Sequence, residues 1–432
     1  MKKRKTWKIK NKSWEWWISC VKMPVFFIIV ALLCHLRMLG LVLIGIFSGV
    51  MVPVLVRQNL KEEDQQQLLE ECSFYMEQLI YSFRKHHKIL AALRDIVLIT
   101  QGRLKLCVES ALYDIENHTS DENLFQHGFS KIGEIYQVHL LDTLHAFLIR
   151  VEEQGGDCNM ALGILLDQLR AWKKSQKEFL SRKKGIQNRL ILSVVLSCLI
   201  CLAVVRMMPV LDTVIASPIY QLCTGAGIVV LQAVYLWFRT VDGKQRKIQE
   251  QDDAQIAKMY ARLHSSARGP GYWRCVKKLE QQIQQQFPQW MFDMILRLQT
   301  ENVQTAINRS LDDAPEVMVR PLYQLSEELQ LDPVSIQPYL NFLEEFQLPE
   351  IRAVMLQLYA INDMGREDIQ EQIGAMLDQN QKMTEVSEEL KADNILSGLG
   401  MLAAVPMLIS VVVLLVDLTL MLFSFLGEVY IL

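Results

Sequence analysis

The residue types that most often carry chemistry are scattered along this chain, and few share a spacing that a site requires. Cys198 and Cys201 form the one close pair among nine cysteines. This CxxC spacing occurs in redox and metal sites, which need a polar or electropositive setting. The pair lies in an apolar run with no histidine nearby. We therefore interpret both residues as small apolar side chains of a membrane helix.

The histidines do not form a metal-ligand pattern. The first half of the chain carries His86, His87, His118, His127, His139 and His145. An HExxH pair is missing, and the last two of these histidines are six residues apart, which places them on different faces of a helix. Glu152 and Glu153 could bind a cation, but a charge cluster at a helix end is the simpler interpretation. We predict solvated histidines, no metal site and no cofactor.

The sequence also lacks a phosphate-binding loop. No GxxxxGK[ST] motif occurs, and Gly243-Lys244 is followed by Gln245. We therefore predict that the chain is not an enzyme, with no catalytic residue, and that any energy it uses is supplied by another protein.

Two ionisable residues stand near or within long apolar stretches. Arg206 and Asp417 are expected to face the interior of a helix bundle or a partner. One interpretation is that they pair with each other; another is that Arg206 reaches the outer membrane surface. A transporter would use them to line a pathway across the bilayer. We consider that alternative weaker, because most of the chain lies outside the apolar stretches.

The elements that position these residues begin with membrane spans. Half of the chain is hydrophobic, yet 22% is charged, so charged stretches fold outside the bilayer. Residues 190–210 and 219–238 are each long enough to cross a hydrocarbon core. The loop between them, 211–218, has no lysine or arginine, whereas basic residues flank the outer ends. This asymmetry predicts a hairpin that starts and ends in the cytoplasm.

The two ends of the chain carry further apolar segments. Residues 1–15 form a basic tail, for which anionic lipid is a more plausible partner than nucleic acid. We prefer two spans over 16–56, turning at His35 to Arg37, to one long tilted helix. Residues 395–426 contain Pro406 and form either one kinked span or two short ones.

The charged stretches show helical periodicity. Residues 57–189 contain no run that alternates long enough for a strand, and they predict a bundle of about six short helices. Residues 239–285 read as a basic, polar linker, and 286–394 as a second bundle. In the latter, Asp332-Pro333 and Leu348-Pro349 are predicted helix starts. The fold class is all-α, a polytopic membrane protein with two cytoplasmic helical bundles.

These two bundles are predicted to be a duplication. Ala92-Leu93 and Ala306-Ile307 lie about 214 residues apart, within helices of similar pattern. The closing turns, at Gly155-Gly156 and at Gly365, lie about 210 residues apart. Each bundle is preceded by a membrane hairpin.

Several segments are similar to motifs of the type II secretion system F-domain family, the membrane platform proteins of type II secretion, type IV pili and Tad pili. Lys88 to Leu93 resembles the small-apolar step of these domains, with lysine in place of the usual glycine. Glu152 to Gly156, with the leucines that follow, resembles their closing turn and helix. Phe287-Pro288 and Asn362 to Gly365 are the similar segments of the second bundle. The chain as a whole looks like two tandem Tad-type modules.

The resemblance implies an inner-membrane scaffold in a bacterium, with a cytoplasmic amino terminus. Its implied partners are a cytoplasmic hexameric secretion or pilus ATPase, pilin-like subunits, other platform components and further copies of itself. The sequence offers six candidate structural or coupling residues: Arg206, Asp417, Glu152, Gly155, Gly156 and Gly365.

Overall fold

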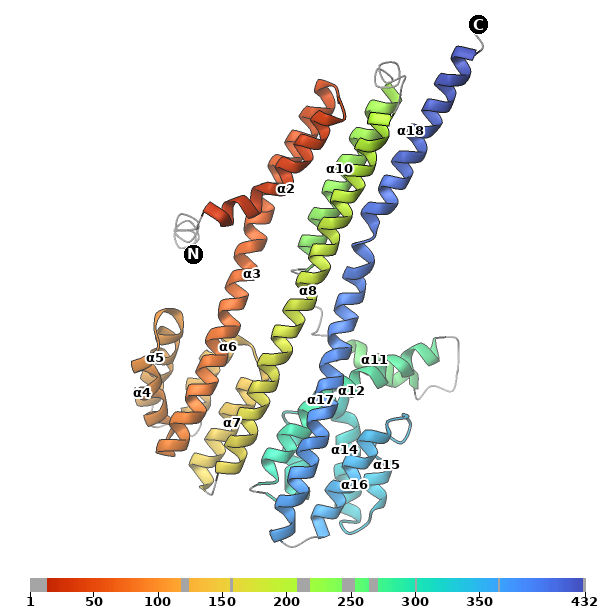
Figure 1. Cartoon of the computed structure of the whole chain (residues 1–432). Coiled ribbons are helices and arrows are strands. Elements are labelled where there is room, and N and C mark those ends of the chain that lie inside the picture. The colour runs from red at the N-terminus through yellow and green to blue at the C-terminus, as the bar shows by residue number, and fades with distance from the viewer. Residues whose placement is uncertain are drawn as a thin grey trace. The chain divides into compact units, whose positions relative to one another are not determined.

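Figure 1 shows the computed structural model, which describes residues 14–117, 124–155, 158–207, 218–242, 253–263, 271–299, 301–363 and 366–429. Within these residues every regular element is a helix and no strand occurs. The predicted all-α class is confirmed for this part of the chain. Four of the helices are also long and apolar enough to cross a membrane.

The chain divides into two compact units. The membrane unit comprises residues 1–66, 179–249 and 394–432, and the bundle unit comprises 67–178 and 250–393. Most of the two stretches that were predicted to form separate bundles, 57–189 and 286–394, therefore belongs to a single unit, and the ends 57–66 and 179–189 belong to the membrane unit. Three helices contribute residues to both units: α3 (Met38–His86), α8 (Asn159–Met207) and α17 (Arg366–Leu402).

In the membrane unit, α2 (Trp14–Leu33) and α3 are separated by a break around His35, whose φ of 51° is left-handed. The break falls at the predicted turn. Only Cys20–Leu33 of α2 is strongly apolar, which is shorter than a full span. α10 (Pro218–Asp242) and residues Leu396–Leu420 supply further candidate spans. The latter is interrupted where α17 ends and α18 (Val405–Val429) begins, next to Pro406.

The first half of the bundle unit contains six helices, as the periodicity predicted. They are the end of α3 and the start of α8, with α4 (Ile89–Ile99), α5 (Gly102–Asn117), α6 (Leu124–Tyr136) and α7 (His139–Gln154) between them. Their apolar faces meet in one core of leucine, isoleucine, valine, alanine, cysteine and aromatic side chains. Burial of these faces stabilises helices that are too short to be stable alone.

The second half contains the same series of helices and one more. They are α11 (Asp253–Leu263), α12 (Tyr272–Arg297), α13 (Val303–Ser310), α14 (Glu316–Leu331), α15 (Gln337–Asn341), α16 (Pro349–Asp363) and the start of α17.

Two predictions for the second half were wrong. Residues 239–285 are not simply a linker, because Tyr260 on α11 and Leu279 on α12 are buried in the core. The glutamines and charges on the outer faces of these helices gave the segment a polar composition. Pro333 does not start a helix: it lies in a turn, and only the short α15 forms before the next turns. Pro349, by contrast, does begin α16.

Helices of the two halves correspond in order, apart from the one additional helix of the second half. α4 starts at 89 and α13 at 303, and α5 starts at 102 and α14 at 316, so both pairs are offset by 214 residues. Equivalent pairs also pack together: α4 contacts α5 and α7, while α13 contacts α14 and α16.

The buried positions follow the same offsets. Across α4 and α5, every residue buried in the first half has a buried equivalent in the second. In α4 and α13 the matched positions are Ile89 with Val303, Ala92 with Ala306, Leu93 with Ile307, and Ile96 with Ser310. Buried Tyr75 on α3 matches buried Trp290 on α12 at an offset of 215 residues. Buried Leu148 on α7 matches buried Leu358 on α16 at an offset of 210 residues. This agreement supports an internal duplication.

The two halves meet through α7 and α12, and Ser175 of α8 also donates a hydrogen bond to Glu388 of α17 at 3.4 Å. Phe292 and Leu296 of α12 are buried among the core residues of the first half, not those of their own half. Beside them, Thr143 on α7 donates a hydrogen bond to Asp293, with an Oγ1–Oδ1 distance of 2.9 Å. His139 lies 3.4 Å from the same carboxylate, and the guanidinium of Arg150 lies 3.9 Å from Glu301. Apolar burial and charge pairing therefore both join the halves.

Candidate functional site

Glu152, a predicted site residue, closes the amino-terminal end of α4. Its Oε2 accepts a hydrogen bond from the backbone N–H of Ile89 at 2.6 Å, and its Oε1 lies 3.6 Å from the ammonium group of Lys88. The Glu152 side chain is 12% exposed, whereas that of Lys88 is 67% exposed. A carboxylate at this place satisfies a helix N–H that has no partner within the helix, and it interacts favourably with the helix dipole.

Gly155 ends α7 next to this contact. Its φ of 73° is in the left-handed region, which glycine adopts without a Cβ clash, and its N–H bonds to the carbonyl of Val151 at 2.9 Å. Gly156 and Gly365 lie outside the described residues. The structure thus places Glu152 and Gly155 together at one closing turn, where each helps to fix a helix end.

His145 contradicts the prediction that the histidines are solvated. Its ring is buried, stacks on Phe129 with ring centroids 3.8 Å apart, and lies 3.1 Å from the hydroxyl of Tyr75. Burial lowers the pKa of His145 to about 3, so the ring is neutral at physiological pH. The sequence held a signal for this, because position 145 falls on the same helix face as Leu141 and Leu148.

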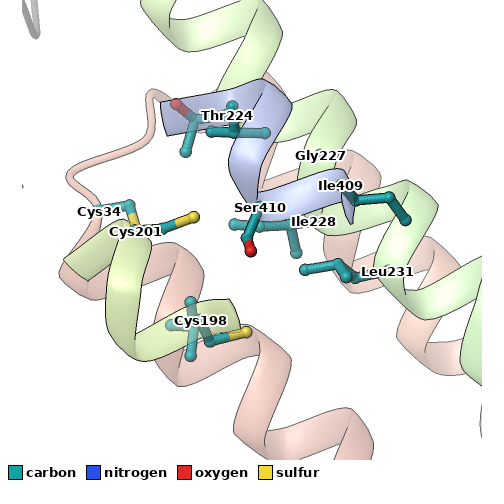
Figure 2. A pocket seen from close by; sticks show the side chains of 11 residues that line it. Cys34, Cys198, Cys201, Thr224, Gly227, Ile228, Leu231, Ile409 and Ser410 are labelled. Carbon is teal, nitrogen blue, oxygen red and sulfur yellow. The ribbon is translucent and has the colours of Figure 1, made fainter. Parts of the chain in front are cut away.

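The predicted absence of a metal site stays a prediction, although the described residues contain no suitable group of three ligands. Cys34, Cys198 and Cys201 do line one cavity in the membrane unit, and Figure 2 shows them beside the α10 residues Ile228 and Leu231. The cavity measures about 10 Å³, roughly the space of one water molecule.

Asp417 is the most unusual side chain of the membrane unit. It is 1% exposed, and its Oδ1 has no hydrogen-bond partner among the described atoms. Cys34, Cys201 and Tyr220 lie close enough to interact with its charge. Arg206 belongs to α8, but its side chain lies outside the part of the chain that can be described. The pairing of Arg206 with Asp417 therefore stays a prediction.

Other polar groups in the membrane unit join its helices. The Gln232 amide on α10 donates to the Ser48 hydroxyl on α3 at 2.8 Å. Ser193 on α8 donates to the carbonyl of Ala403, in the break before α18, at 2.8 Å. Tyr220 on α10 donates to the carbonyl of Cys34 at 3.1 Å. Such bonds between helices stabilise packing where the hydrophobic effect contributes little.

Glycine brings two of these helices close together. A Cβ at Gly227 of α10 would lie 2.8 Å from a methyl carbon of Val413 on α18, closer than real Cβ contacts allow. By contrast, a Cβ at Gly45 or Gly49, the GxxxG pair of α3, would meet nothing within 4 Å. The contact between α10 and α18 therefore depends on a small residue, and the α3 pair makes no such contact with the described part of the chain.

Comparison with known proteins adds no assignment: no protein-family model, curated protein or solved structure matches the chain.

Proposed function

We propose that the protein is a membrane scaffold, the platform of a pilus or type II secretion-like assembly machine. The observation that carries this proposal is the duplicated helical module. Each copy follows apolar helices, and each ends in a helix that also contributes to the membrane unit. A protein built in this way has two equivalent surfaces for partners outside the membrane and helices for partners within it.

In this proposal, the modules lie in the cytoplasm of a bacterium and bind a hexameric ring ATPase. The membrane helices contact pilin-like subunits and other platform components. The given sequence has no phosphate-binding loop, so the ATPase supplies the energy. α3, α8 and α17 are the elements best suited to carry a displacement, because each continues without a break from one unit to the other.

The proposal is tested with the full-length chain in its native membrane. We expect it to co-purify with a ring ATPase encoded beside its gene, and we expect deletion of its gene to abolish filament assembly or secretion. A catalytically inactive ATPase variant controls for loss of the nucleotide cycle, because it should still bind. Absence of ATPase binding together with normal filaments in the deletion strain would refute the proposal.

A transporter for a small solute is the second candidate, and the buried carboxylate of Asp417 is the observation that favours it. The described cavity of the membrane unit, which Cys34, Cys201 and Val413 line and Asp417 does not, has room for about one water, which is too small for most solutes. Uptake of a labelled solute into vesicles that contain the purified protein, lost in Asp417→Asn, would establish transport in place of a scaffold role.

A further inference from the structure

The contact that α7 makes with α12 joins faces of the two halves that are not equivalent, unlike the contact of Ser175 on α8 with Glu388 on α17. The first half contributes α7, through His139 and Thr143, and the second contributes α12, through Asp293. Just beyond α12, Glu301 pairs with Arg150 of α7. In the duplication, α7 corresponds to α16, and α12 corresponds to the bundle part of α3. A contact between unlike faces is heterologous, so among the described residues each half keeps one such face that does not make this contact and could repeat it.

On the second half, the free face lies on α16. At the offset of 210, Ala353 is equivalent to Thr143 and Ala360 is equivalent to Arg150. Ala353 is exposed and Ala360 is half-buried. Leu356 lies between them on the same face and is exposed. Two alanines flanking a leucine form a shallow surface that a large side chain can approach closely.

On the first half, the free face lies on α3. The residue equivalent to Leu296, at the offset of 215, is Tyr81, and Gln78 is equivalent to Asp293. Glu77, equivalent to Phe292, pairs with Lys173 of α8 at 2.6 Å. Leu296 is buried at the contact within the chain, whereas Tyr81 is 44% exposed. Phe74, two turns before Tyr81 on α3, is also exposed. Aromatic side chains that stand free on a surface are typical of protein interfaces.

We propose that the α16 face of one chain binds the α3 face of a second copy, repeating between chains the contact that α7 and α12 make within one. Tyr81 of one copy packs against Ala353, Leu356 and Ala360 of the other. Copies in one membrane share an orientation, so this head-to-tail contact closes into a ring if successive rotations add up to a full turn. The inference does not depend on the proposed function.

Cross-linking in native membranes tests the pairing of faces. Two full-length copies with different tags are produced together, one carrying Tyr81→Cys and the other Leu356→Cys, and are treated with a short thiol cross-linker. We expect a product that carries both tags. Wild-type copies give the background from the natural cysteines, and Tyr81→Cys with Leu331→Cys, an exposed position on α14, should give no product above it. Cross-links only between two Tyr81→Cys copies, or none, would overturn the proposal.

Particle mass in lipid nanodiscs gives a second measurement. The wild-type protein should form an assembly of several chains, and Leu356→Arg should reduce it to single chains, because the charge would be buried at the contact. Leu331→Arg should keep the wild-type mass. Both substitutions are at exposed positions, so folding should survive, which a far-ultraviolet dichroism spectrum verifies. A single-chain mass for the wild type, or an unchanged mass for Leu356→Arg, contradicts the inference.

Discussion

At the scale of single residues, equivalent helix ends and core positions of the two halves are occupied by different side chains. The start of α4 is closed by Glu152 from α7, whereas its equivalent α13 is closed by its own Asn302, which accepts the N–H of Thr305 at 2.8 Å. His145 occupies the place that Met355 has in the second half, both buried. Among the described residues, each half therefore contains a polar contact that the other lacks, and substitution of the residues involved tests each contact.

The neutral state of His145 makes stability depend on pH. Its pKa is about 3 in the folded protein, while an unfolded histidine has a pKa of about 6.5. Between these values the unfolded state binds an additional proton, so the free energy of unfolding falls as the pH is lowered, by up to about 1.4 kcal/mol per pH unit from this group. We expect this slope to be smaller in a Tyr75→Phe, His145→Met double variant.

Chemical denaturation of the full chain in detergent, at pH 7 and at pH 5, measures that difference. The double variant is preferable to His145→Met alone, which leaves the buried Tyr75 hydroxyl without its partner at a cost of about 1–3 kcal/mol. An equal loss of stability on acidification in the wild type and the double variant would exclude His145 as a source of the pH dependence.

Glu152 should matter through its contact with the helix end. Glu152→Ala removes the acceptor for the Ile89 N–H, and we expect a loss of about 1–2 kcal/mol in the free energy of unfolding. Lys88→Ala is the matched control, because its exposed ion pair with the same carboxylate contributes about 0–1 kcal/mol. Denaturation midpoints of the two variants measure the contrast. Equal midpoints would mean that the ion pair, not the cap, is the important contact.

At the scale of elements, helix contacts depend on the side chains at the crossing points. α5 and α6 approach closely because Gly128 faces Ile115: a Cβ at Gly128 would lie 2.6 Å from a side-chain carbon of Ile115. Gly163 of α8 has no neighbour within 4 Å of such a Cβ. The two glycines are both helical, but only one is required by packing.

Substitution separates these two cases. Gly128→Ala should destabilise the protein by about 1–3 kcal/mol, because the new methyl group overpacks the contact between α5 and α6. Gly163→Ala should leave stability unchanged or raise it by about 0.5–1 kcal/mol, since alanine favours a helix. Thermal unfolding of both variants measures the effects, and a stabilising Gly128→Ala would show that α5 and α6 separate at little cost.

At the scale of the whole molecule, the hydropathy pattern sets where the chain meets the bilayer. Four helices are apolar enough to span it, and α2 contributes a shorter apolar stretch that precedes the break at His35. If both α2 and α3 cross the bilayer, the basic tail and the first half of the bundle unit lie on the same side of it. The charge bias around the second hairpin predicts that this side is the cytoplasm.

Reporter fusions test this topology in living cells. A cytoplasmic reporter should be active after Gln58 and after Lys244, and a reporter that functions only outside should be active after Pro209. The fusion after Lys244 serves as the control for the second hairpin, whose sequence signal is the strongest. An external signal at Gln58 would mean that only one of α2 and α3 crosses the membrane.

Sequence periodicity alone predicted the helical class, the six helices of the first half and the duplication. Apolar spacing is a local property, so each segment of the sequence carries it independently. It also placed Glu152 and Gly155 at a closing turn. It wrongly predicted a linker at 239–285, because the polar outer faces of two core helices gave the segment a polar composition. It also wrongly predicted a helix start at Pro333, because proline is equally common in turns.

Tertiary structure decided what depends on contacts distant in the sequence. Burial of His145 follows from Tyr75 and Phe129, which lie on other helices. The union of the two bundles into one unit follows from Phe292 and Leu296, which periodicity assigns to an apolar face but not to a particular partner. A sequence fixes which faces must be buried, whereas only the packed chain specifies which face covers which, because that choice depends on shape and charge across helices that no local pattern connects.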